Sequence, residues 1–272
     1  MSSPSPPSSP SPVTPLNRFR KSVPLERPVP RADPTAAIAF TAFVLGSGFS
    51  LALALTVPLL IPDSIWSLVS SIEMQGRRLI RLPTSALPAY VAAWCLFHTL
   101  EYLVTAIWNP SKVYWGSFLL SNGMAYNVAS SLVIVEYVVE SYFFPSLKTV
   151  GWWTYLGLSI VVVGQSLRSL AMIQASVSFS HHVAFRKKDD HVLVKTGLYA
   201  YARHPSYMAF WWWAVGTQIM TANPIMLTLF AVLLWRWFFK RIGEEEFLLV
   251  RFFGQEYIEY RKKVTSGLPL LR

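Results

Sequence analysis

Three groups of ionisable residues interrupt an otherwise apolar sequence, and each has residue types that binding and catalytic sites use. The first is the polar stretch 181–205, which gathers imidazoles, phenols and guanidinium groups beside an apolar segment. The second is Arg241, followed by three adjacent glutamates at 244–246. The third is Arg168, inside an apolar segment, where an ionisable group indicates a function unless its long side chain reaches the membrane surface.

The chemistry open to these groups is the binding of charged ligands. A guanidinium can hold a carboxylate through paired hydrogen bonds, and a run of acids can bind a cation. Ordinary interpretations stay open as well, because the polar stretch suits a basic loop and the acids suit a helix start. His98 and Glu101, three residues apart, could simply pair inside a helix bundle. The glutamates at 136 and 140 could be solvated at a membrane edge.

The elements that must position these groups are membrane helices. Apolar residues make up 53% of the 272 residues and charged residues only 14%, against about 25% charged in soluble domains. The net charge of +10 is typical of cytoplasmic loops of membrane proteins and does not follow the pattern of a nucleic-acid surface. The single cysteine, Cys95, excludes an intrachain disulfide and a cysteine-based zinc site.

The apolar segments predict an all-α, polytopic transmembrane bundle of about six spans, within a range of five to eight. A span needs about 20 apolar residues. The predicted spans are 36–61, 87–108, 118–144, 150–175 and 205–235, the last split into two helices at Asn223-Pro224 because proline removes a backbone donor. The segment 240–263 is polar with helical spacing and suits a surface helix.

The basic residues predict that both termini face the cytosol, as does the site. In that orientation cytosolic segments hold 18 of the 24 Lys and Arg residues, against four in lumenal segments. Three of those four, Arg77, Arg78 and Arg81, run against the trend. The predicted regions are a disordered Ser/Pro-rich tail at 1–35, N-terminal membrane helices at 36–148, and a catalytic region at 149–272 that contains a hairpin at 206–240.

The stretch from Arg168 to Pro269 resembles the isoprenylcysteine carboxyl methyltransferases. The residues that carry the resemblance are Arg168-Ser-Leu-Ala-Met172, Phe179-Ser-His181, His191-Val-Leu-Val194, Gly197-Leu-Tyr199, Arg203-His-Pro-Ser-Tyr207, Gly216-Thr-Gln218, Asn223-Pro224, Trp235-Arg236, Glu245-Glu246, Phe252-Phe-Gly254, Tyr257, Tyr260 and Gly267-Leu-Pro269. They cover more than a third of the chain in order, whereas the first 165 residues carry little of the resemblance.

The resemblance implies a multi-pass enzyme of the endoplasmic reticulum membrane that uses S-adenosylmethionine and no metal. By the same resemblance, this enzyme would methylate the carboxylate of a farnesylated or geranylgeranylated cysteine in processed CaaX proteins. The resemblance also implies that Arg241 binds the substrate. It implies that the cofactor is bound by His191, Val192, Leu193, Val194, Tyr199, His204, Pro205, Ser206, Tyr207 and Glu245. Arg168 is a second candidate for holding the carboxylate. Ala184 stands where the family often has a glutamine that touches the cofactor.

This reaction fits the residues present, since a carboxylate is already ionised at neutral pH and needs no general base. The sequence holds no Ser/His/Asp or Cys/His nucleophilic set. Arg-His-Pro-x-Tyr followed by Glu-Glu is also found in phospholipid N-methyltransferases and some sterol reductases, so both remain alternatives, as does a non-catalytic scaffold. A metal-dependent lipid hydroxylase needs clustered histidines, and the chain has five histidines in all.

Overall fold

The computed structural model describes residues 35–61, 85–121, 123–182, 186–187 and 191–271, which belong to one compact unit. The predicted tail up to residue 34, the arginines at 77, 78 and 81, and Ala184 lie outside the described residues. Except for one isolated bridge between Ala202 and Thr265, the described residues form helices and connecting segments. The all-α prediction is therefore confirmed.

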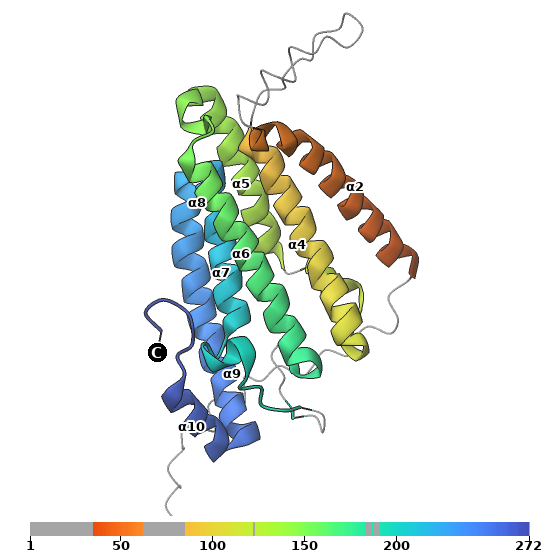
Figure 1. Cartoon of the computed structure of the whole chain (residues 1–272), viewed down its shortest axis with the longest axis vertical. Coiled ribbons are helices and arrows are strands. Elements are labelled where there is room, and N and C mark those ends of the chain that lie inside the picture. Colours follow the sequence, from red (N-terminus) through yellow and green to blue (C-terminus); the bar gives the residue numbers. More distant parts are fainter. Residues whose placement is uncertain (1–34, 62–84, 122, 183–185, 188–190, 272) are drawn as a thin grey trace, which may run out of the picture. The chain divides into compact units, whose positions relative to one another are not determined.

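The long helices stand side by side, and successive ones run antiparallel (Figure 1). The α-helices are α2 (Thr35–Leu60), α4 (Ala86–Trp108), α5 (Met124–Phe143), α6 (Trp152–Ala175), α7 (Pro205–Thr221), α8 (Pro224–Leu229), α9 (Trp235–Phe253) and α10 (Gln255–Lys263). The short elements are η1 (Pro110–Lys112), η2 (Trp115–Phe118), η3 (Pro145–Lys148), η4 (Ser176–Ser178), η5 (Gly197–Ala200) and the π-helical η6 (Phe230–Leu234).

The apolar segments predicted these helices to within a few residues at most ends. The predicted turn at Asn223-Pro224 lies between α7 and α8, where Ala222 adopts a left-handed conformation with φ of 51°. The second helix of the hairpin, however, does not stop near residue 235. It continues through η6 into α9. Within the π-helical turn, the Ala231 carbonyl oxygen accepts a hydrogen bond from Trp211 Nε1 at 3.1 Å, which joins η6 to α7.

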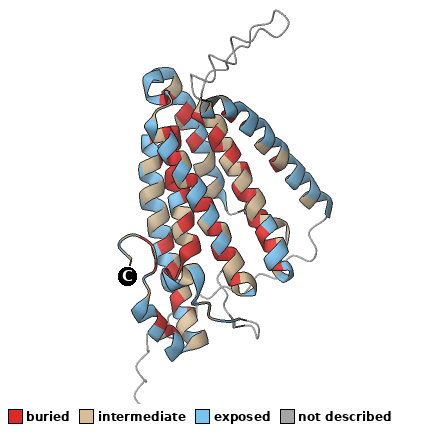
Figure 2. Ribbon diagram, viewed as in Figure 1, coloured by how far each residue is buried: buried red, intermediate tan, exposed pale blue. Residues whose placement is uncertain are grey.

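Three of the described helical stretches are long and apolar enough to cross a membrane: Thr35–Val57, Ala86–Trp108 and Trp152–Ser178. Their outer faces carry large exposed apolar side chains, as at Leu51 and Val162. Figure 2 shows that buried residues concentrate where α4, α6 and α7 face one another, whereas α2 is exposed over most of its length. Such a surface is stable in lipid and costly in water, so the chain is a multi-pass membrane protein.

Close packing of α6 on α7 fixes the centre of the bundle. A Cβ atom at Gly157 of α6 would lie 2.2 Å from the backbone nitrogen of Met220 in α7, so only glycine allows this approach. Small residues at helix interfaces let membrane helices pack this closely. The approach sets α6 and α7 in register and brings Arg168, near the end of α6, beside Ser206 at the start of α7.

Polar groups at the α5–α6 and α7–α8 turns are satisfied within the bundle rather than by solvent. Lys148 Nζ lies 2.7 Å from the Glu140 carboxylate and donates to the backbone carbonyls of Thr221 and Ala222 at the end of α7. The Glu136 carboxylate accepts hydrogen bonds from the first backbone amides of α8. Glu140 is buried, so its interpretation as a solvated group was wrong, whereas Glu136 is partly exposed and also caps the start of α8.

Candidate active site

A cavity opens where the C-terminal end of α6 and the N-terminal end of α7 meet α9 and α10. Four connecting stretches complete its wall: η4 with the residues that follow it, residues 191–194, η5, and residues 203–204. Its lining comprises Ala175, Ser178, Phe179, Ser180, His191, Val192, Leu193, Val194, Tyr199, Arg203, His204, Pro205, Ser206, Tyr207, Glu245, Leu249, Phe253, Tyr257 and Tyr260. One carboxylate and several hydroxyls face apolar side chains there, a composition that suits a mixed polar and apolar ligand.

The connecting stretches of the wall are held by specific hydrogen bonds. Ser178 Oγ accepts from the backbone nitrogen of Val192 at 3.1 Å and donates to its carbonyl oxygen at 3.0 Å. Tyr260 Oη donates to the carbonyl oxygen of Tyr199 at 2.5 Å, and the Tyr199 hydroxyl donates to that of Ala171. The loop is therefore fixed to both α6 and α10.

Arg203, which lines the cavity just before α7, pairs with Glu246 of α9 and bonds the segment that follows α10. Arg203 Nε and Nη2 lie 2.8 and 2.7 Å from Glu246 Oε1, and Arg203 Nη1 donates to the carbonyl of Val264. Burial alone would raise the pKa of Glu246. Hydrogen bonds from His204 and Arg203, with the charge of Arg203, outweigh burial and lower this pKa to about 2. Glu246 is therefore ionised and serves as a structural anchor.

Arg241 lies at the edge of the cavity. Its Nε donates to the Tyr207 hydroxyl at 3.4 Å and its Nη2 to the His181 carbonyl oxygen at 3.0 Å. The Tyr207 hydroxyl in turn donates to Glu245 Oε2 at 2.7 Å. Unlike Arg168 and Arg203, Arg241 forms no ion pair with a carboxylate of the described residues. Its charge is therefore available to an anionic ligand beside the cavity.

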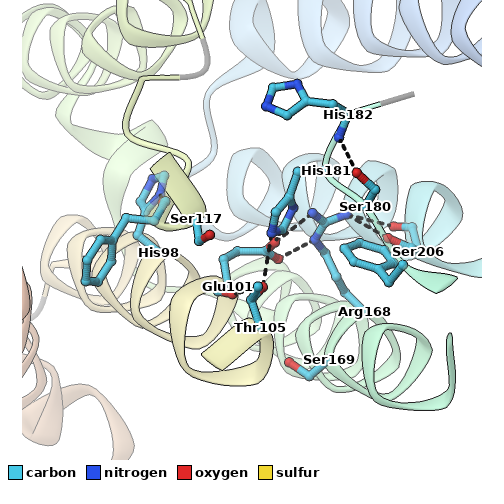
Figure 3. Close-up of polar contacts among 12 residues, drawn as sticks. His98, Glu101, Thr105, Ser117, Arg168, Ser169, Ser180, His181, His182 and Ser206 are labelled. Carbon is cyan, nitrogen blue, oxygen red and sulfur yellow. Dashed lines mark hydrogen bonds and ion pairs between the residues drawn. The ribbon is translucent and has the colours of Figure 1, made fainter. Parts of the chain in front are cut away.

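Arg168 has a different environment, shown in Figure 3. It is buried inside the bundle, so the alternative that it reaches the membrane surface was wrong. Its Nε and Nη2 donate to the two carboxylate oxygens of Glu101 in α4, and its Nη1 donates to Ser206. Glu101 therefore does not pair with His98, whose ring nitrogens contact the Phe118 carbonyl oxygen and the Tyr126 hydroxyl.

Comparison with known proteins identifies the family. Residues 156–251 match the profile of the Isoprenylcysteine carboxyl methyltransferase (ICMT) family. The protein-S-isoprenylcysteine O-methyltransferase of Saccharomyces cerevisiae is 48% identical over 188 residues, which make up 67% of this chain and 79% of the yeast chain. The chain belongs to the isoprenylcysteine carboxyl methyltransferase family.

Other relatives agree with this family assignment. The human enzyme of the same name is 44% identical over 183 residues, and the match spans 64% of the human chain, just under two thirds of its length. The Dictyostelium discoideum enzyme is 43% identical over 76% of its length. A solved structure, the eukaryotic intramembrane Ras methyltransferase ICMT, superposes with a TM-score of 0.74 at 35% identity. It covers 86% of this chain and 77% of that one.

The structure brings together all ten residues that the family resemblance assigned to the cofactor, since each of them lines the cavity. Their binding role stays a prediction. The two predicted arginines do not line the cavity themselves. Each donates a hydrogen bond to a lining residue, Arg241 to Tyr207 and Arg168 to Ser206. Sequence reasoning gave no site role to Arg203 or Glu246, although both stand in the quoted motifs. It also missed Glu101, whose only signal was an acid within an apolar segment.

Proposed function

We propose that the chain transfers a methyl group from S-adenosylmethionine to the C-terminal carboxylate of a prenylated cysteine, giving a methyl ester. Family membership supports this activity over phospholipid N-methylation and sterol reduction. The observation that carries the proposal is the position of Arg241, an arginine without a described carboxylate partner, at the edge of a cavity lined by the family's motif residues.

The lining fits S-adenosylmethionine by its chemistry. Glu245 offers a carboxylate for the cationic or hydroxyl-bearing part of the cofactor, and Tyr207 holds that carboxylate in place at 2.7 Å. The imidazoles of His191 and His204 suit its polar ends, and Leu249 and Phe253 supply apolar wall. When bound, S-adenosylmethionine supplies an electrophilic methyl group on a cationic sulfur, and methylation turns this cation and the carboxylate into a neutral thioether and a neutral ester.

The protein's own contribution is positioning and the exclusion of water. No residue has to remove a proton, because the acceptor carboxylate is ionised at neutral pH. Arg241 holds one carboxylate oxygen and leaves the other to form the new bond, since a grip on both would lower their nucleophilicity. Holding two reactants in the correct geometry can lower a barrier by about 7–11 kcal/mol in favourable cases.

The membrane setting supplies the acceptor. A farnesyl or geranylgeranyl group partitions into lipid at about 0.8 kcal/mol per buried CH₂, so a prenylated CaaX protein presents its terminal cysteine at the bilayer surface. We propose about six spans in the endoplasmic reticulum membrane, with the cavity and both termini on the cytosolic side. The excess of basic residues in the segments on that side supports this orientation.

Transfer of a labelled methyl group from S-adenosylmethionine by the purified chain tests the proposal. We expect label in N-acetyl-S-farnesylcysteine or its geranylgeranyl analogue and none in phosphatidylethanolamine. Label in the phospholipid alone would show that the acceptor is an amine. Failure to bind S-adenosylmethionine in calorimetry would overturn the proposal altogether.

A further inference from the structure

Glu101 is a fully buried carboxylate on α4 that lies outside the cavity lining. A buried charge is costly unless its partners satisfy it, and ionisable groups inside membrane helices commonly have functions. It stands outside the motifs that carry the family resemblance. Two sets of contacts lead from this carboxylate to the two sides of the proposed reaction (Figure 3).

The first set of contacts leads to the cofactor side. Both oxygens of Glu101 accept from Arg168, at 2.5 and 2.9 Å, in a bidentate pair that fixes the plane of the guanidinium. Phe97 and Phe210 flank that plane, with ring centroids 5.5 and 5.2 Å from Arg168 Cζ. The remaining Nη1 donates to Ser206 Oγ at 2.9 Å, so Glu101 sets the position of a cavity-lining residue through Arg168.

The second set of contacts leads to the acceptor side. His181 Nδ1 lies 3.5 Å from Glu101 Oε2, and its Nε2 lies 3.1 Å from the hydroxyl of Thr105, one turn further along α4. Because the Thr105 hydroxyl donates its single proton to the Glu101 backbone carbonyl oxygen at 2.8 Å, His181 Nε2 donates to Thr105 Oγ1, and His181 Nδ1 has no hydrogen-bond partner among the described residues. The His181 carbonyl oxygen then accepts from Arg241 at 3.0 Å. Thr105 therefore holds His181, whose backbone carbonyl oxygen bonds the acceptor arginine, and the Glu101 carboxylate lies against the same imidazole.

The same face of α4 continues this attachment at its C-terminal end. Asn109 Nδ2 donates to the Phe179 carbonyl oxygen at 2.9 Å, and Lys112 Nζ donates to it at 2.7 Å. Phe179 lines the cavity. Three polar residues thus fasten residues 179–181 to this end of α4: Thr105 on the helix, Asn109 at its C-cap and Lys112 in η1.

We propose that Glu101 is a positioning residue for methyl transfer: through Arg168 it sets the position of Ser206, which lines the proposed cofactor cavity. This inference rests on the proposed function. Displacement of a reacting group by about 1 Å can cost about 100-fold in rate. The carboxylate itself touches neither reactant and is not a catalytic residue.

Glu101→Gln tests this role, and Glu140→Gln is its matched control. Both residues are buried carboxylates with a basic partner, but Glu140 pairs with Lys148 beside the α7–α8 turn, and neither of these two residues lines the cavity. We expect Glu101→Gln to raise the calorimetric Kd for S-adenosylmethionine at least threefold. For Glu140→Gln we expect this Kd within twofold of wild type.

Glu101→Gln with Arg168→Met separates positioning from stability. The double variant removes both buried charges, so we expect its thermal unfolding midpoint to recover toward that of wild type while the defect in S-adenosylmethionine affinity persists. The double variant also serves if the single variant does not fold. Recovery of S-adenosylmethionine affinity in the double variant would overturn the proposal, as would an equal defect in Glu140→Gln. If wild type binds S-adenosylmethionine but does not methylate prenylcysteine, the proposed function fails, and the cofactor-affinity comparison still tests Glu101.

Discussion

At the scale of single residues, two arginines of similar sequence context differ in the partners that the fold gives them. Arg168 donates through Nε, Nη1 and Nη2 to Glu101 and Ser206, so its hydrogen-bonding capacity is largely used inside the bundle. Arg241 donates to a phenol and a backbone carbonyl, both neutral groups. We therefore assign the carboxylate-binding role to Arg241 and a positioning role to Arg168.

Arg241→Lys should impair acceptor binding while the affinity for S-adenosylmethionine stays unchanged. Lysine keeps the charge but not the planar fork of donors. Since a hydrogen bond to a charged group contributes about 1.5–3 kcal/mol, we expect kcat/KM for the prenylcysteine to fall roughly 10- to 100-fold. Steady-state kinetics and calorimetry measure the two effects, and Arg236→Lys, an exposed position on the same helix, is the control. An unchanged kcat/KM would remove Arg241 from the acceptor site.

At the scale of elements, η5 depends on one glycine. Gly197 has φ of 61°, and a Cβ atom there would lie 2.5 Å from Gln174 Nε2. The Gln174 side chain also accepts a hydrogen bond from the Leu198 backbone nitrogen at 2.8 Å. Gly197→Ala should therefore displace η5 and the cavity-lining Tyr199.

We expect Gly197→Ala to weaken S-adenosylmethionine binding at least fivefold and to lower the thermal unfolding midpoint. Gly243→Ala, in α9, is the control. No atom lies within 4 Å of its added Cβ, and alanine is about 1 kcal/mol more favourable than glycine inside a helix. Wild-type cofactor affinity in Gly197→Ala would show that η5 does not shape the binding site.

The joint between α7, α9 and α10 should be acid-sensitive through Glu246. Its pKa is lowered from 4.5 to about 2, so its contribution to stability is complete above about pH 4.5 and is lost as the pH falls through about 2. The Glu246→Gln variant lacks this contribution. The difference in thermal unfolding midpoint between wild type and variant should therefore be largest near neutral pH and shrink between about pH 4.5 and 2. A difference that is constant with pH would contradict this origin.

At the scale of the whole molecule, the sequence predicted the helices better than their contacts. Runs of apolar residues and Asn223-Pro224 located α2, α4, α5, α6 and the α7–α8 hairpin, because span length and proline chemistry act locally. Motif spacing, through the family resemblance, located the cavity lining. The partners of Glu101, Glu140 and Lys148 were not predictable, since they lie 67, 8 and 75 residues away in sequence and depend on how the helices pack.

The proposed orientation can be tested with introduced cysteines, because the native Cys95 is buried and should react little. In sealed microsomes, an impermeant maleimide should label Glu256→Cys on α10 and should not label Thr149→Cys between α5 and α6 until detergent is added. Both positions are exposed. Labelling of Thr149→Cys alone before detergent would show that the orientation is the opposite of the proposed one. Labelling of both positions would show that the two ends of the bundle are not separated by the membrane.

The account depends most directly on the acceptor being a free prenylcysteine carboxylate. Labelled S-adenosylmethionine is incubated with the purified chain and either N-acetyl-S-farnesylcysteine or its C-terminal amide, and base-labile methyl ester is measured. We predict label in the acid and none in the amide. Label in both acceptors, or in neither while other lipids are methylated, would contradict the proposal that the acceptor is a prenylcysteine carboxylate.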